Sequence, residues 1–100
     1  MTYALNELAL IEYHEAAQWY KDRSLQASEN FIGAIEFAIK EILKRPDCYQ
    51  PVGDEIRVFR LKKYPYKIHY LLEGDHVTIY SVTSTHRQPD YWRKRLPGKL

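Results

Sequence analysis

Cationic side chains gather in the part of the sequence whose residues alternate as strands do. A histidine, an arginine and a tyrosine follow the last of these predicted strands. The two groups are Arg57, Arg60, Lys62, Lys63 and Lys67, and then His86, Arg87 and Tyr91. Cleavage of RNA without a metal needs a base for the 2′-hydroxyl, positive charge beside the phosphorane and an acid for the leaving oxygen. These residue types permit that chemistry.

The charge of the chain is divided between its two halves. Residues 1–55 carry five Lys and Arg against ten Asp and Glu, a balance of −5, whereas residues 56–100 carry ten against three, a balance of +7. A basic half indicates contact with an anionic partner, and the acidic half faces water or a basic partner. Solvated surface is the alternative interpretation of the same division.

Length and composition exclude several classes of protein. One hundred residues, 45% of them hydrophobic, predict a single domain over 1–100. The lone cysteine, Cys48, excludes an intrachain disulfide framework and a Cys-rich zinc site, and the histidines show no metal-ligand spacing, so we expect no metal and no cofactor. The longest apolar run is four residues, which is too short for a membrane span. We therefore expect a cytoplasmic protein without a membrane partner.

The first half of the sequence predicts two helices. Residues 1–5 suit a short strand, and Asn6 suits the N-cap of a helix whose apolar residues recur every three or four positions as far as Tyr20. Residues 24–27 are interpreted as a connector, and Ser28 as the cap of a second helix that runs to about Arg45, before Pro46. A short connection between two helices predicts an antiparallel hairpin.

The second half predicts strands. After a loop over 46–54, residues 56–61 predict a strand with either a bulge or two covered faces. Residues 66–72 alternate cleanly, a turn follows, and 77–82 form a third strand, while 88–100 predict a short helical turn with a tail. The expected fold is α+β, in the order β-α-α-β-β-β, with the helical hairpin packed on a small antiparallel sheet. In such a sheet, the start of the Lys67 strand meets the end of the last strand.

The order of these motifs resembles the RelE/ParE toxin superfamily. The segment IRVFRL at 56–61 is followed by YPYKIHY at 64–70, and the AAQWY motif at 16–20 matches the helical hairpin of that family. The segment HRQPDYW at 86–92 is similar to the tail of the ParE-like branch. The resemblance implies the toxin of a type II toxin–antitoxin pair, bound by a cognate antitoxin in a hetero-oligomer. RelE-like members cleave ribosome-bound mRNA, and ParE-like members poison DNA gyrase.

The resemblance also implies site residues. For an RNase they are Arg57, Lys67 and His86, although Arg57 on a central strand could instead pair with a carboxylate of the helices. We expect a surface that binds the target or a nucleic acid to be formed by Arg60, Lys62, Lys63, Arg87, Tyr91 and Arg93. The continuation past His86 favours the ParE-like branch over an RNase. An inactive member that serves only as an interaction module is a third reading.

Overall fold

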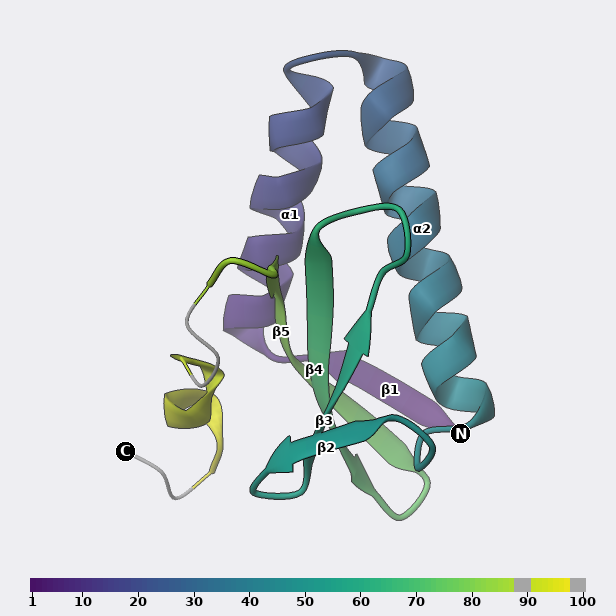
Figure 1. Cartoon of the computed structure of the whole chain (residues 1–100), viewed down its shortest axis with the longest axis vertical. Helices are drawn as coiled ribbons and strands as arrows, with labels where there is room; N and C mark the ends of the chain where they lie inside the picture. The colour runs from purple at the N-terminus through teal and green to yellow at the C-terminus, as the bar shows by residue number, and fades with distance from the viewer. Residues whose placement is uncertain (88–90, 98–100) are drawn as a thin grey trace.

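Two antiparallel helices cover one face of a five-stranded sheet, and a short helical turn lies on the other side (Figure 1). The computed structural model describes residues 1–87 and 91–97. Its elements are β1 (Thr2–Leu5), α1 (Glu7–Lys21), α2 (Leu25–Lys44), β2 (Gln50–Gly53), β3 (Ile56–Arg60), β4 (Tyr66–Glu73), β5 (His76–Ser84) and the 3₁₀ turn η1 (Tyr91–Arg95). The predicted α+β class and helical hairpin are confirmed.

The sheet is mixed, with the strand order β1-β5-β4-β3-β2. The first and last strands, β1 and β5, pair in parallel, whereas the other neighbours are antiparallel, as expected for the pairs β3–β4 and β4–β5. Our antiparallel expectation was wrong for β1. Its partner β5 is separated from it in the chain by both helices and by β2, β3 and β4, so no tight turn fixes an antiparallel direction.

A further strand, β2, occupies part of the segment that we interpreted as a loop. It is exposed throughout and contains Pro51, which is compatible only with a sheet edge or a bulge. Its turn into β3 places Asp54 and Glu55 at φ angles of 51° and 64°. Hairpin turns of this hand usually carry Asn and Gly, so the sequence lacked the usual signal.

One helix start was predicted correctly and the other was not. The side chain of Asn6 accepts a hydrogen bond from the Leu8 amide at 2.9 Å, as an N-cap does. The second helix begins at Leu25, and Ser24 is its cap, with its oxygen 2.9 Å from the Ala27 amide. Ser28 is instead buried between the helices, where its hydroxyl donates to the Ala17 carbonyl at 3.1 Å.

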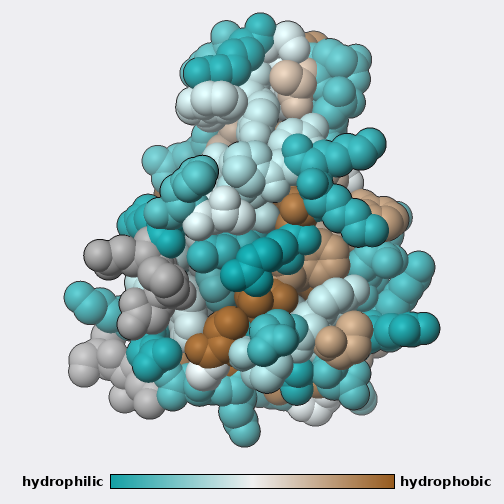
Figure 2. All heavy atoms as spheres, viewed as in Figure 1, coloured by the Kyte–Doolittle hydropathy of each residue, from teal (hydrophilic) through white to brown (hydrophobic). Residues whose placement is uncertain are grey.

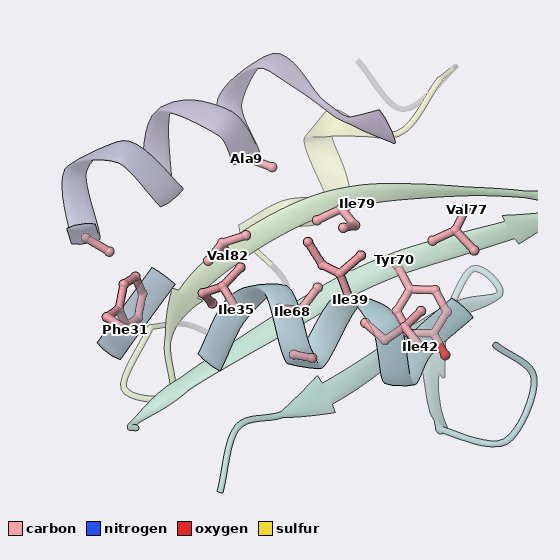
Figure 3. Close-up of a cluster of buried hydrophobic side chains, with 12 residues drawn as sticks. Ala9, Phe31, Ile35, Ile39, Ile42, Ile68, Tyr70, Val77, Ile79 and Val82 are labelled. Carbon is pink, nitrogen blue, oxygen red and sulfur yellow. The ribbon is translucent and has the colours of Figure 1, made fainter. Parts of the chain in front are cut away.

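The main core lies between the helices and the sheet (Figure 3). Phe31 is fully buried, its ring stacked on Tyr20 with 4.7 Å between centroids and tilted against Tyr66 at 5.2 Å. Tyr70 is also fully buried, and its hydroxyl donates to the Pro46 carbonyl. Tyr66 is half-buried against the same core. Tyr66 and Tyr70 therefore both belong to the helix–sheet core.

A second, smaller cluster closes part of the opposite face of the sheet. Trp92 of η1 is fully buried and packs with Leu96 against Ile56 of β3 and Tyr80 of β5. Strand β3 is consequently covered on both faces, which was one of our two alternatives for this segment. The predicted helical turn in 88–100 is confirmed for Tyr91–Arg95, whereas 88–90 and 98–100 lie outside the described residues.

Candidate functional site

A row of buried polar side chains lies on the sheet face opposite the helices. Lys67 pairs in register with Thr83, and the next residues on this face, His69 and Ser81, are also partners. All four are at most 6% exposed. Their sequence neighbours Ile68 and Val82 pack on the helix side, as strand alternation requires. The expected meeting of the Lys67 strand with the end of the last strand is confirmed by the pair Tyr66 and Ser84.

Lys67 is the cation within this row. Its side chain makes neither a hydrogen bond nor an ion pair within residues 1–87 and 91–97, although it is only 6% exposed. Burial lowers the pKa of its ammonium, and the neighbouring guanidinium of Arg60, its register partner on β3, lowers that pKa further. A lysine in this environment can hold an anion, because an anion would relieve both effects.

His69 is the imidazole of this row and is neutral. Its Nδ1 lies 2.6 Å from the Ser81 hydroxyl oxygen, and its ring centroid lies 5.2 Å from that of Trp92. Burial, followed by the positive charges of Lys67 and other cations, lowers the pKa of His69 to about 3. An imidazole in this state does not supply a proton near neutral pH. These contacts are typical of a histidine with a structural role.

One carboxylate attaches η1 to the body of the protein. Oε1 of Glu12, on α1, lies 2.8 Å from Arg95 Nη1 and 3.0 Å from the Val82 amide, while Oε2 accepts from the Tyr91 hydroxyl at 2.8 Å. Arg95 also donates to the carbonyl of Tyr80, 2.9 Å away. Tyr80 is the extra residue of a bulge between β4 and β5, and a bulge frees its backbone groups from the ladder.

The structure does not bring the three residues of the RNase hypothesis together. Arg57 lies on the helix side of β3, where its guanidinium donates to the Tyr49 carbonyl at 2.7 Å. Lys67 lies on the opposite face of the sheet, and His86 is exposed beyond the end of β5. The alternative for Arg57, a pair with a helix carboxylate, is also not what the structure shows, because its partner is a backbone carbonyl.

Of the residues predicted to bind a target, one group lies around the connection between β3 and β4. Arg60 is exposed at the end of β3. Lys62 and Lys63 are exposed in the connection itself, where they line a groove beside α2. This group presents positive charge to solvent.

The other group belongs to the C-terminal segment and makes internal contacts. The guanidinium of Arg87 lies over the Tyr91 ring at 4.4 Å, and the Tyr91 hydroxyl contacts Glu12. Arg93 Nε lies 3.3 Å from a carboxylate oxygen of Asp54. These side chains fasten η1 to its surroundings, and their assignment to target binding stays a prediction.

Sequence reasoning overlooked Glu12. It lies three residues after Ala9 and four before Ala16, the two buried alanines of α1. A carboxylate at that spacing lies beside the buried stripe of a helix and requires a partner there. This spacing was a usable signal, but the partner, Arg95, is 83 residues away.

The described residues provide neither a metal site nor a helix that could span a membrane. Within 1–87 and 91–97, no group of three or more His, Cys, Asp or Glu side chains is placed to hold a metal ion. Neither of the two helices, nor any other described segment, is both long and apolar enough to cross a membrane as a helix.

Comparison with known proteins identifies a structural neighbour. No protein-family model matches the sequence, and no curated protein matches it. The fold is similar to a chain of the chromosomal ParDE TA system from P. aeruginosa, with a TM-score of 0.63 and 14% sequence identity. The match covers 84% of this chain and 95% of that chain. At this identity, the likeness establishes a shared fold.

Proposed function

We propose that this chain is the toxin of a type II toxin–antitoxin system, held inactive in the cytoplasm by a cognate antitoxin protein in a hetero-oligomer. The observation that carries the proposal is the shared fold with a chain of a ParDE TA system, over 84% of this chain. The resemblance of its sequence motifs to the RelE/ParE superfamily supports the same assignment. A fold can host several functions, so the target requires its own argument.

We favour DNA gyrase as the target, with a ParE-like action that involves no catalysis. The geometry supports this choice. Arg57 and Lys67 lie on opposite faces of the sheet, and the guanidinium of Arg57 holds a backbone carbonyl. The buried imidazole of His69 is neutral, with a pKa of about 3. Trp92 and Leu96 cover part of the sheet face that carries Lys67. A general acid, a general base and a phosphate-binding cation are therefore not gathered around one point.

Cleavage of mRNA is the second candidate, and Lys67 is the observation in its favour. The Lys67 side chain is 6% exposed, makes no hydrogen bond or ion pair with a described residue and keeps its ammonium in contact with solvent, so a phosphate group can reach it. His86 follows Ser84, the register partner of Tyr66, so it lies near the same end of β4. In this reading Lys67 would bind the scissile phosphate and His86 would transfer a proton.

Induced expression in a bacterial host separates the two candidates. Growth, transcript decay and DNA supercoiling are followed in parallel after induction. We expect growth arrest with loss of supercoiling and double-strand breaks, while transcripts stay intact. The variants Lys67→Ala and His86→Ala should retain the arrest, because neither residue acts in catalysis under the favoured reading. Phe31→Ala, which removes a core side chain, serves as a destabilised control in which the arrest should be weakened.

Other outcomes contradict the proposal at different levels. Cut transcripts that appear before any DNA damage, and that disappear in Lys67→Ala, would establish the RNase instead of the gyrase poison. Absence of any growth defect with folded protein present would leave the third class, an inactive member that serves as an interaction module.

A further inference from the structure

We propose that the groove between α2 and the β3–β4 connection is a docking surface for an acidic segment of a partner protein. The segment would place an apolar side chain in the groove and its carboxylates beside Lys62 and Lys63. Under the proposed function this partner is the antitoxin. The identity of the partner rests on the proposed function, whereas the docking surface itself does not.

The shape of the groove suits a side chain rather than a cofactor. Its volume is about 290 Å³, at the lower end of the range for small-molecule pockets, roughly 300 Å³ and above. The lining residues are apolar apart from the two lysines and the hydroxyl of Tyr64: Ala34, Phe37, Ala38, Phe59, Leu61, Lys62, Lys63 and Tyr64. The small alanines of α2 leave the space that a partner side chain would fill.

An aromatic side chain beside this groove is left open to water. Phe37 is 61% exposed, although it lies on α2 between buried residues of the main core. In the space-filling view, hydrophobic side chains gather near the centre of the face, with hydrophilic ones around them (Figure 2). Exposed apolar surface with a polar rim is typical of an interaction site.

The charge beside the groove selects the kind of partner. Both charged residues of the lining are lysines, and neither Lys62 nor Lys63 forms an ion pair with any residue in 1–87 or 91–97. Carboxylates of a partner would complement them, whereas a basic segment would be repelled. Three of the lining residues are aromatic, but the rings of Phe59 and Tyr64 pack against the main core, on Tyr49 and Phe31 respectively. Phe37 is thus the lining aromatic that is mostly exposed, which favours a protein side chain over a run of stacked nucleobases.

Binding of synthetic probes to the full chain tests the inference. The first probe is a short amphipathic peptide with leucines on one face and glutamates elsewhere. The comparison peptides replace every glutamate by lysine, or every leucine by glutamine, and a single-stranded RNA oligonucleotide tests the nucleic-acid alternative. Fluorescence anisotropy measures affinity, and NMR chemical shifts locate the contact. We expect the acidic, leucine-bearing peptide to bind best and to shift the signals of the groove residues.

Variants with matched controls identify the groove. Phe37→Glu should weaken the acidic peptide at least about tenfold, whereas Leu25→Glu, at a residue equally exposed on the same helix (62%), should not. The double variant Lys62→Glu with Lys63→Glu should weaken it about tenfold at low salt and less at high salt, whereas Lys94→Glu on η1 should have little effect. Phe37→Ser repeats the first variant without adding charge.

Three results would overturn the inference: equal binding of the lysine peptide, shifts confined to another surface, or RNA that displaces the acidic peptide from the groove. These results are independent of growth arrest in cells. A toxic chain with no binding at the groove refutes this inference alone. A harmless chain that binds the acidic peptide there refutes the toxin function and leaves the docking surface.

Discussion

The two faces of the sheet are closed by different kinds of interaction. On the helix side, apolar and aromatic side chains from both helices pack against β4 and β5. The ring of Phe31 contacts four tyrosine rings, those of Tyr13, Tyr20, Tyr64 and Tyr66. On the opposite side, η1 covers the sheet through Trp92 and Leu96 and is fastened by the carboxylate of Glu12. Beneath and beside η1 lies the row of buried polar side chains that includes Lys67 and His69.

This difference separates stability from function within one small domain. Burial of apolar side chains is the main favourable term in folding, and the helix side supplies most of it. Partial desolvation of the Lys67 ammonium and burial of the His69 imidazole oppose folding, so their presence on the other face needs a reason outside stability. Sites of function often carry such a cost. Three measurements can test this difference between the two faces of the sheet.

The largest effect is expected on the helix side. Phe31→Ala should lower the free energy of unfolding by about 3–5 kcal/mol, because it removes a fully buried ring from an aromatic cluster. Phe37→Ala, on the exposed side of the same helix, should change it by less than about 0.5 kcal/mol. Urea denaturation measures both. Similar losses for the two variants would mean that the helix side does not hold the core described above.

A smaller and local effect is expected at the attachment of η1. Glu12→Gln keeps the side-chain shape but removes the charge that faces Arg95, so it should cost about 2–3 kcal/mol. The loss should expose Trp92 and leave the helix side intact. In a Trp19→Phe background, the emission of Trp92 should shift to the red and become quenchable by acrylamide.

Glu15→Gln, which changes an exposed carboxylate on the same helix, is the control for this variant. Equal loss of hydrogen-exchange protection in the helices and in η1 would argue against a separate attachment through Glu12.

The third expected effect is the pH dependence of stability that His69 contributes, which is spread over several pH units. The pKa of His69 is about 3 in the folded chain, below the ordinary value near 6.5, so the unfolded chain binds its proton more readily. Stability should therefore rise with pH between about 3 and 6.5, by up to about 1.4 kcal/mol per pH unit. Acid titration of unfolding should show this slope reduced in His69→Asn. The exposed His14→Gln is the control, and equal slopes in all three proteins would contradict a buried neutral imidazole.

Local signals in the sequence were sufficient for most of the helices and strands. The cap at Asn6, the apolar spacing of α1 and α2, and the alternation in β4 are each encoded within a few residues. The two serines Ser24 and Ser28 are four residues apart and both suit a cap. Only the packing of the helices decides that Ser28 is buried and that Ser24 begins the helix.

The candidate site was less predictable, because the face on which a strand residue lies depends on pairing as well as parity. Lys67 and Arg57 were both recognised as cations on neighbouring strands, yet the register of β3 with β4 places them on opposite faces. The bulge at Tyr80 reverses parity within β5, so Ile79 and Val82 share the helix side although three positions separate them.

The sequence alone determined the two helices and the order β-α-α-β-β-β of the elements other than β2, the division of charge between the two halves and the absence of a disulfide framework, because composition and short-range periodicity are sufficient for these. The tertiary structure decided which cations stay open to solvent at Lys62 and Lys63 and which one is buried at Lys67. It also decided that a carboxylate at position 12 is paired with a guanidinium at position 95. Residues so distant in the chain meet because β1 pairs with β5, which brings α1 beside the segment that follows β5, and no local pattern encodes this pairing.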